Sequence, residues 1–392
     1  MKIGLSTSVI QGGKSGVAQY VFALVEALAR HEQHLELILF VLEKDVPLFG
    51  FAKYAKIIPV PERYRSPIRN ILWHQTVLPL LARAHELDVL HIPSYRRMLW
   101  FGPCPLVTTI HDLAPFHVAK KYDWLRMFYG RVVARWLARR QDSIITVSHN
   151  TRRDVERFFG IPDDQLKVVH NGIDHARFFP GSVDEAKACV AEQHKVRGPF
   201  FLYVARLEHP AKNHVRLIRA FNLFKARTRS DWKLVFGGSD WHGADAIHSA
   251  VQQSPFRRDI FSLGFVEPSA LPKLYRAADV FVYPSLFEGF GFPPLEAMAC
   301  GCPVICSNRG ALGEIVGDAA VIVDPEDAQA LQKQLSRVAC EPELRRQLRE
   351  SGLARAEGFD WDDTAVRTLE TYRGVAKTKK QVANASAVEL PG

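Results

Sequence analysis

Two basic and two acidic residues in the second half of the chain are spaced for work on a diphosphate and on sugar hydroxyls. Arg206 stands at the end of an apolar run, and Lys212 follows in a short loop before a helical pattern. Two cations at such a strand end are placed for a diphosphate. Glu288 lies in the glycine-rich segment FEGFGFPPLE, and Glu296 lies about one turn into the next helix. A carboxylate in the loop can accept from sugar hydroxyls, and one on the helix can accept from a ribose diol. Taken singly, each of these residues would be an ordinary solvated surface charge.

Glycine near these residues and near the N-terminus allows the backbone to approach an anion closely. Between the two glutamates, the N–H groups of Phe290, Gly291 and Phe292 can face a phosphate. Near the N-terminus, the segment QGGKSG contains Gly13 and Gly16 and opens a helical pattern, whose first N–H groups carry a partial positive charge. The segment is neither the G-x-G-x-x-G fingerprint nor a Walker loop. A plain glycine-rich turn of a Rossmann-like domain is therefore an alternative to a phosphate site.

Apolar runs alternate with amphipathic stretches along the chain, and this alternation predicts parallel sheets covered by helices on both faces, an α/β fold. The predicted strands are 2–9, 35–42, 88–92, 105–110, 143–147, 166–170, 200–205, 232–236, 259–263, 279–283, 303–306 and 320–323. The predicted helices include 17–30, 124–140, 150–159, 213–228, 270–277, 292–299 and 327–339.

The length of 392 residues suits two domains, since cores stop growing well below that size. We assign 1–185 to an N-terminal domain and 198–360 to a C-terminal domain, because weak periodicity flanked by proline and glycine over 180–198 is typical of a linker. A last helix is expected at 361–375. The residues from 376 to 392 have little to bury, and we expect a disordered tail.

The composition is that of a soluble globular enzyme, with 47% hydrophobic and 24% charged residues. No apolar run reaches the roughly 18 residues of a membrane span, and the first residues do not have the pattern of a secretory signal. We therefore expect a cytoplasmic protein. Cys300, Cys302 and Cys306 lie in one apolar run, which favours reduced core cysteines over a metal site.

The net charge is +9, and much of the basic excess lies in the N-terminal half. Seven basic residues and one acidic residue occur from Lys120 to Arg140, among aromatic and aliphatic residues at helical spacing. A helix over 120–140 either lies on an anionic membrane surface or has a solvated basic face, and both interpretations stay open. No nucleic-acid partner is expected, because no nucleic-acid-binding motif is present.

Together these motifs resemble the retaining GT-B glycosyltransferases of family 4 (GT4). The likeness rests on E-x7-E with GFG inside it, on R-x5-K and on G-G-x-x-G, and it covers roughly 1–375. The segments at 109–113, 171–174 and 310–314 also fit, although many relatives carry proline at the position of Gly313. The resemblance implies two Rossmann-like domains facing a central cleft, with the last helix crossing back to the N-terminal domain.

The resemblance also implies roles for residues. Arg206 and Lys212 would bind the donor diphosphate, Glu288 the sugar hydroxyls and Glu296 the ribose. His111 would lie near the transferred sugar, although a hydrogen-bonded structural histidine is an alternative. The other positions implied for the donor are Gly13, Gly16, Val266, Phe290, Gly291, Phe292 and Leu295.

The function that follows is hexosyl transfer with retention of configuration, without a cofactor or a metal. We read the acidic pair Asp360 and Asp362 as the start of the last helix. GDP-mannose is the favoured donor, and a polyprenyl-diphosphate-linked saccharide of exopolysaccharide or lipopolysaccharide assembly is the favoured acceptor. The enzyme would then be peripheral on the inner face of the cell membrane. Open alternatives are a UDP- or dTDP-hexose donor, a soluble acceptor, a GT-B epimerase and a non-catalytic nucleotide-sugar-binding protein.

Overall fold

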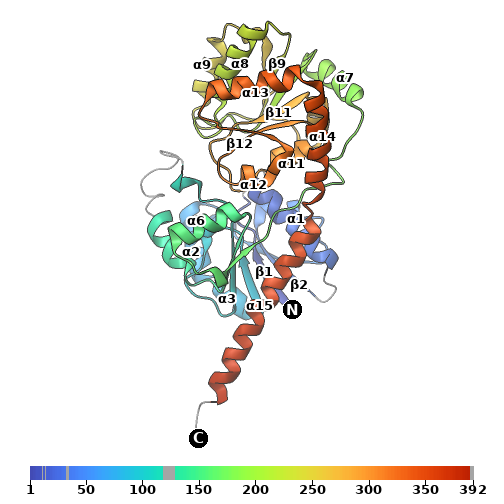
Figure 1. Ribbon diagram of the computed structural model, residues 1–392. Coiled ribbons are helices and arrows are strands. Elements are labelled where there is room, and N and C mark those ends of the chain that lie inside the picture. The colour runs from blue at the N-terminus through green and yellow to red at the C-terminus, as the bar shows by residue number, and fades with distance from the viewer. Residues whose placement is uncertain (11, 14, 32–34, 118–128, 389–392) are drawn as a thin grey trace. The chain divides into compact units, whose positions relative to one another are not determined.

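The protein divides into two compact units, each built around one parallel sheet (Figure 1). The computed structural model describes residues 1–10, 12–13, 15–31, 35–117 and 129–388. The first unit holds residues 1–115, 122–172 and 361–392, and the second holds residues 116–121 and 173–360. Both units have the Rossmann-like α/β architecture expected from the alternating pattern.

The sheet of the first unit has seven parallel strands in the order β3-β2-β1-β4-β5-β6-β7. Its strands are β1 (Lys2–Ser6), β2 (Glu36–Leu42), β3 (Lys56–Val60), β4 (Val89–Ile92), β5 (Leu106–Ile110), β6 (Ser143–Thr146) and β7 (Leu166–Val168). All except β3 were predicted. Strand β3 contains Pro59, which cannot donate a ladder hydrogen bond and is tolerated because β3 lies at the edge of the sheet.

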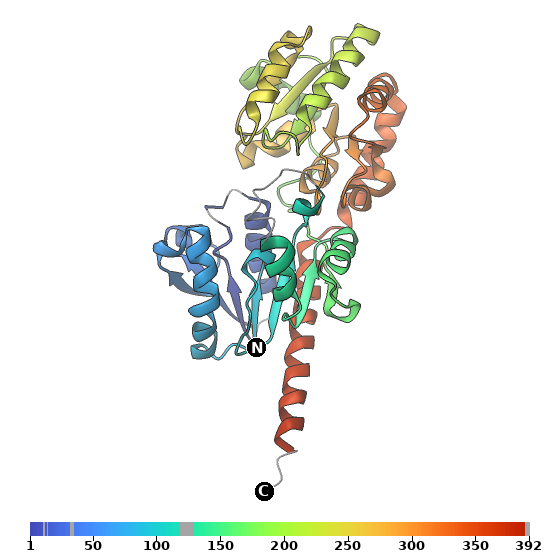
Figure 2. The same cartoon turned by 90° about the vertical axis from the view of Figure 1, so that its left-hand side faces the viewer.

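Helices lie on both sides of this sheet (Figure 2). The helices of the first unit are α1 (Gly16–His31), α2 (Pro67–Thr76), α3 (Leu78–Ala84), α5 (Ala134–Ala138), α6 (His149–Phe159) and α15 (Trp361–Val388). Trp73 of α2 is 1% exposed and packs with Phe40, Leu78 and Leu90 in one apolar core. Helices α1 and α15 pack against each other, and α15 also contacts β4 and β6.

The sheet of the second unit has six parallel strands in the order β10-β9-β8-β11-β12-β13. Its strands are β8 (Phe200–Val204), β9 (Lys233–Gly237), β10 (Ile260–Ser262), β11 (Val280–Tyr283), β12 (Val304–Ser307) and β13 (Val321–Val323). The helices are α7 (Val183–His194), α8 (His214–Thr228), α9 (Ala244–Gln252), α10 (Leu271–Ala277), α11 (Phe292–Ala299), α12 (Leu312–Val316), α13 (Ala328–Cys340) and α14 (Pro342–Glu357). All six strands were predicted.

The prediction of an interdomain linker at 180–198 was wrong, because this segment contains helix α7. Ser182 caps the helix by accepting a hydrogen bond from the N–H of Glu185 at 3.2 Å. Only Ala186 and Val190 of α7 are buried, so the helical pattern is weak. Helix α7 packs on α10 within the second unit. The boundary between the units therefore lies after residue 172, and not at residue 185 as predicted.

The C-terminal helix returns to the first unit, as expected, but it is longer than 361–375. Helix α15 continues to Val388 and extends past the sheet (Figure 1), so the structure has a helix over most of the segment expected to be disordered. Alanine, lysine and glutamine in this stretch are good helix formers. The acidic pair marks the start of α15, where Asp362 accepts a hydrogen bond from Arg30 at 2.6 Å.

The basic stretch 120–140 is described only in part. Residues 118–128 lie outside the described residues, and the remainder forms a π-helical turn at Tyr129–Val133 followed by α5. Among the helices of the described ranges, none has the length and apolarity to cross a membrane. Cys300, Cys302 and Cys306 are unpaired by disulfides and at most 2% exposed, which confirms them as core cysteines.

Candidate functional site

Strand order locates the candidate site of the second unit. The chain leaves β8 towards β9 on one side, and β11, β12 and β13 lie on the other side. Ligands of open α/β sheets bind at this switch point, beyond the carboxyl ends of the strands. Arg206 and Lys212 follow β8, and Glu288 follows β11, so the sheet places three of the predicted residues at this edge.

Lys212 and Glu288 meet at the switch point. The Lys212 Nζ donates to Glu288 Oε1 at 2.5 Å, and the two side chains are only 17% and 19% exposed. The same carboxylate oxygen accepts from the hydroxyls of Ser285 at 2.7 Å and Tyr283 at 3.0 Å. Burial raises the pKa of Tyr283 well above its usual value, and the Glu288 charge raises it further, so this phenol stays a donor. Glu288 is therefore fixed as a carboxylate beside a cation.

The loop that carries Glu288 depends on close backbone contact. Gly310 has a φ of +65°, and a Cβ there would lie 2.3 Å from the Glu288 carbonyl oxygen. The N–H of Ala311 donates to that carbonyl at 2.9 Å. Gly291 has a φ of +127°, which L side chains rarely adopt. The glycines in FEGFG and RGALG therefore let two loops lie against each other and hold the glutamate in place.

Arg206 lies at the same edge but outside the Lys212 cluster. Its guanidinium is 4.7 Å from the ring centroid of Trp241, a cation–π distance, and 3.6 Å from the Glu208 carboxylate. Its side chain is 54% exposed. The structure therefore leaves this guanidinium accessible beyond the end of β8, with one aromatic face to orient it.

Glu296 is in the interior of the second unit, on α11. It is 7% exposed and accepts a hydrogen bond from the Tyr275 hydroxyl at 2.9 Å. Burial raises the pKa of the Glu296 carboxyl to about 7, while the Tyr275 hydrogen bond and Arg177 act in the opposite direction. The carboxyl therefore changes its charge near neutral pH.

A pH-dependent stability follows for Glu296. Its folded pKa of about 7 lies above the ordinary value of 4.5, so its contribution is complete below pH 4.5 and is lost as the pH rises through 7. The full change is about 3 kcal/mol. We expect the unfolding free energy of the wild type, relative to Glu296→Gln, to fall between pH 5 and pH 8 in urea titrations. Parallel curves for the two proteins would contradict this ionisation.

The remaining predicted residues of the second unit surround the same edge. Phe290 is 5% exposed and packs edge-on against Phe359, with ring centroids 5.9 Å apart. Leu295 is fully buried, and Val266 lies beside Gly237 at the end of β9. Side chains in these positions are structural, so a ligand contact at Phe290 or Leu295 would have to come from the backbone.

In the first unit, the glycine-rich turn and His111 lie near the start of α1. Gly16 is the first residue of α1, and Gly13 has a φ of +81°. His111 follows β5 and packs edge-on against Tyr20 of α1, with ring centroids 4.7 Å apart. The structure therefore places His111 against the helix that Gly16 begins.

The protonation state of His111 can be deduced. Burial lowers its pKa to about 4, so the ring is neutral at physiological pH. The ring hydrogen-bonds the backbone of Pro93, which has no N–H, so a ring nitrogen must donate to the carbonyl. Nε2 is buried without a partner among the described residues, so Nδ1 is the donor. Nε2 then offers a lone pair that can accept a hydroxyl proton in a hydrogen bond.

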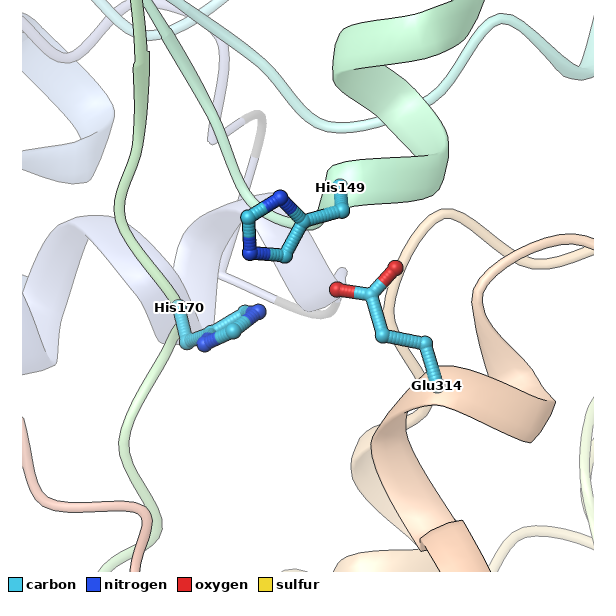
Figure 3. A group of neighbouring side chains, drawn as sticks. All are labelled: His149, His170 and Glu314. Carbon is cyan, nitrogen blue, oxygen red and sulfur yellow. The ribbon is translucent and has the colours of Figure 1, made fainter.

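Two further histidines of the first unit lie close together. His149 begins α6 and His170 follows β7, with ring centroids 5.8 Å apart (Figure 3). Glu314, drawn in the same figure, lies on α12 of the second unit. Two imidazoles alone do not make a zinc site, which needs three or four ligands. We assign this pair no role.

Sequence reasoning missed the residues that orient the two glutamates. Ser285 and Tyr283 stand three and five residues before Glu288, and asking which hydroxyls stand at the end of β11 or just after it would have found them. Tyr275 precedes Glu296 by 21 residues on a different helix, and no local pattern links the two. Only tertiary packing reveals that contact.

The fold and the site together indicate the class of protein. Two parallel α/β units, with ligand-type residues beyond the carboxyl ends of their central strands, form a two-domain nucleotide-binding architecture. Two family models match the chain: Glycosyltransferase Family 4 over residues 14–177 and Glycosyl transferases group 1 over residues 186–355. The chain belongs to the glycosyltransferases of family 4.

Individual relatives agree with this assignment. The O-antigen chain mannosyltransferase B of Escherichia coli is 31% identical over 95% of this chain and 100% of its own length. A glycogen synthase of Mycobacterium tuberculosis is 29% identical over 77% of this chain and 70% of its own length. Among solved structures, the sucrose-phosphate synthase of Thermosynechococcus elongatus superimposes with a TM-score of 0.79 at 22% identity, covering 96% of this chain and 100% of its own. The fold is that of the GT-B glycosyltransferases.

Proposed function

We propose that the protein transfers mannose from GDP-mannose, with retention of configuration, to a polyprenyl-diphosphate-linked saccharide in bacterial exopolysaccharide or lipopolysaccharide assembly. The observation that carries the transfer is the Lys212–Glu288 pair at the switch point of the second unit, 2.5 Å apart. Mannose is supported by the 31% identity to the Escherichia coli mannosyltransferase over nearly the whole chain. The likeness to a glycogen synthase keeps another hexose as the competing donor.

In the proposed reaction, the bond between the anomeric carbon and the diphosphate breaks. Negative charge then grows on the leaving diphosphate, and Lys212 and Arg206 would stabilise it as fixed cations in place of a metal. Glu288, held by Lys212, Ser285 and Tyr283, would accept from the hydroxyls of the sugar. The acceptor oxygen would form the new bond to the anomeric carbon, and the leaving phosphate itself would take the proton of that hydroxyl.

Two other residues would position the donor. Glu296 would accept from the ribose diol in its ionised form, which its pKa of about 7 makes available at pH 8. His111 would accept a hydrogen bond from a sugar hydroxyl through Nε2. Because its ring is neutral, His111 would orient the sugar and would not supply a positive charge.

A nucleotide screen tests the donor. A ligand that binds only the folded protein stabilises it by about 2.7 kcal/mol at one hundred times its Kd. We expect GDP to raise the melting temperature more than UDP, dTDP and ADP do, and we expect Lys212→Met to weaken that shift. A response to UDP without a response to GDP would refute the mannose proposal and favour a UDP-hexose enzyme.

We also propose that the first unit touches an anionic membrane through an aromatic surface, defined here as Trp100, Phe101, Val132 and Trp136. These side chains are 41–63% exposed, and the rings of Trp100 and Trp136 lie 5.2 Å apart. Arg140 lies 3.4 Å from the Trp136 ring centroid, and the other exposed arginines nearby are Arg131, Arg135 and Arg139. Exposed aromatic residues beside arginines suit the interface of an anionic bilayer.

Vesicle sedimentation tests this surface. We expect the wild type to sediment with vesicles rich in phosphatidylglycerol and to stay in solution with phosphatidylcholine vesicles. The double variant Trp100→Ser, Trp136→Ser should bind at least tenfold more weakly, because two aromatic anchors are removed. The matched control Leu223→Ser removes a 40% exposed side chain from α8 of the second unit. Equal binding of the double variant and the control would refute the proposal.

A further inference from the structure

The first unit has its own switch point, between β1 and β4. The chain proceeds from β1 to β2 and β3 on one side of the sheet and from β4 to β5, β6 and β7 on the other. Ser6 and Ser8 stand at the end of β1, and Arg97 closes a 3-10 turn shortly after β4. By the rule for open α/β sheets, a ligand of this unit belongs at this point.

Arg97 is buried at the switch point, and none of the described carboxylates pairs with it. Arg97 is only 8% exposed. Nε donates to the Asn70 Oδ1 at 2.5 Å and Nη1 to the carbonyl of Arg96 at 3.2 Å. Nη2 makes no hydrogen bond to the described residues, and no acidic side chain of those residues pairs with the guanidinium. Burial lowers the pKa of Arg97; the nearby Tyr129 acts in the opposite direction, and the charge of Arg96 lowers the pKa further.

Two other cations in the described parts of the chain show the usual pairing. The buried Lys225 is 5% exposed and lies 2.8 Å from the Asp259 carboxylate. Arg65, with 31% of its side chain exposed, lies 3.1 Å from the buried Asp45. A buried charge without a partner is costly, so folded proteins normally pair it. Arg97 has no such partner among the described residues.

The groups around Arg97 are neutral and polar. The His74 ring of α2 and the Ser6 hydroxyl form a hydrogen bond of 2.9 Å. Burial lowers the pKa of His74 to about 3. The Arg97 charge lowers the pKa of His74 further, so the histidine beside it is neutral. Asn70 lies 3.4 Å from the Ser8 hydroxyl. The described neighbours of Arg97 named here thus provide hydrogen-bonding groups and carry no negative charge.

We propose that the Arg97 guanidinium binds a phosphate group of the acceptor. The inference rests on the proposed function and names the chemical group by which the first unit recognises its acceptor. The planar fork of arginine matches the oxygen pairs of a phosphate and adds charge-assisted hydrogen bonds. A prenyl diphosphate and a soluble sugar phosphate both present this group, and the site would accept either by the same contacts.

Calorimetry with inorganic phosphate and pyrophosphate tests the site on the full chain. The donor site is first filled with the nucleotide that stabilises the protein most in the thermal screen. We expect both the wild type and the control Arg69→Gln, which removes an exposed arginine next to Asn70, to bind a probe. Arg97→Gln should bind about 10- to 100-fold more weakly, and Arg97→Lys should recover only part of the affinity, since it keeps the charge without the fork.

Kinetics separate a binding role from a merely structural one. Arg97→Gln should raise the acceptor KM by a similar factor while the donor KM stays within twofold of the wild type. Farnesyl diphosphate or glucose 6-phosphate should compete with the probe in the wild type, and the stronger competitor identifies the phosphate source. If neither competes, if the wild type binds no probe, or if Arg97→Lys and Arg97→Gln bind like the wild type, the proposal is overturned.

Failure of the proposed function would look different. Phosphate binding by the wild type requires no sugar transfer, so a protein that is inactive with GDP-mannose but loses phosphate binding in Arg97→Gln keeps the site and loses the function. Active transfer with an unchanged acceptor KM in Arg97→Gln would keep the function and remove the site.

Discussion

Lys212→Met should lower kcat/KM for the nucleotide-sugar donor by about 10²- to 10³-fold. The ammonium of Lys212 is held 2.5 Å from the Glu288 carboxylate. The backbone carbonyl of Lys212 accepts a hydrogen bond from the buried Tyr203 hydroxyl at 2.6 Å. A cation fixed in this way can stabilise the leaving diphosphate without reorganisation, and removal of one such group typically costs rate by this factor. Steady-state kinetics with the donor identified in the thermal screen measures the loss.

The matched control for this variant is Lys233→Met. Lys233 also lies in the second unit and pairs with Asp259 at 2.6 Å, with 22% of its side chain exposed. Loss of the Lys233 side chain should lower the melting temperature but leave kcat/KM within about twofold. Lys233 is the first residue of β9 and therefore lies at the end of the strand opposite to the ligand-binding edge. A Lys212→Met enzyme as active as Lys233→Met would contradict the proposed role of Lys212.

Glu288→Gln should lower kcat by about 10²-fold or more. The carboxylate oxygen Oε1 receives hydrogen bonds from Lys212, Ser285 and Tyr283. A glutamine keeps the shape but removes the charge that holds the ammonium, so both the sugar contact and the position of Lys212 are lost. Donor hydrolysis and sugar transfer should fall together, since both break the same bond.

Asp279→Asn is the control for the glutamate. Asp279 pairs with Lys187 at 2.7 Å and accepts from the N–H of Phe200 at 3.0 Å. It thus has a lysine and a hydrogen-bond donor, as Glu288 does, but at the other end of β8. We expect a loss of stability without a loss of kcat. Equal kcat values for Glu288→Gln and the wild type would remove Glu288 from the mechanism.

The fold could be predicted from sequence because its central strands are buried on both faces. Strands such as β8 and β11 are short apolar runs bounded by polar residues, and periodicity finds them directly. Helix α7 was missed because only two of its residues are buried, so its position is set by the cap at Ser182 and by packing on α10. Strand β3 was missed because of its proline.

The site could be predicted only as a set of positions. Placing Lys212 and Glu288 at strand ends needed no more than the order of apolar runs, and the structure brings them into contact. The charge states could not be predicted, because the neutral ring of His111 and the raised pKa of Glu296 both come from burial. Burial of a side chain depends on packing across the whole unit.

The same limit applies to Arg97. In the sequence it is one of several arginines in the N-terminal half, and nothing local distinguishes it from its neighbour Arg96. Its burial after β4, where none of the described acids pairs with it, depends on how α2 packs over the sheet. The neighbouring positions of β1 and β4 in the sheet then show that Arg97 lies at a switch point, where ligands of open α/β sheets bind.

The most direct measurement is transfer itself, with the purified full-length protein, a polyprenyl-diphosphate-linked saccharide in detergent, and radiolabelled GDP-mannose or UDP-glucose. We expect label from GDP-mannose in the lipid-linked product with wild type and Lys233→Met, and loss of that label with Lys212→Met and Glu288→Gln. Label from UDP-glucose alone, label from neither donor, or undiminished transfer by both site variants would contradict the account.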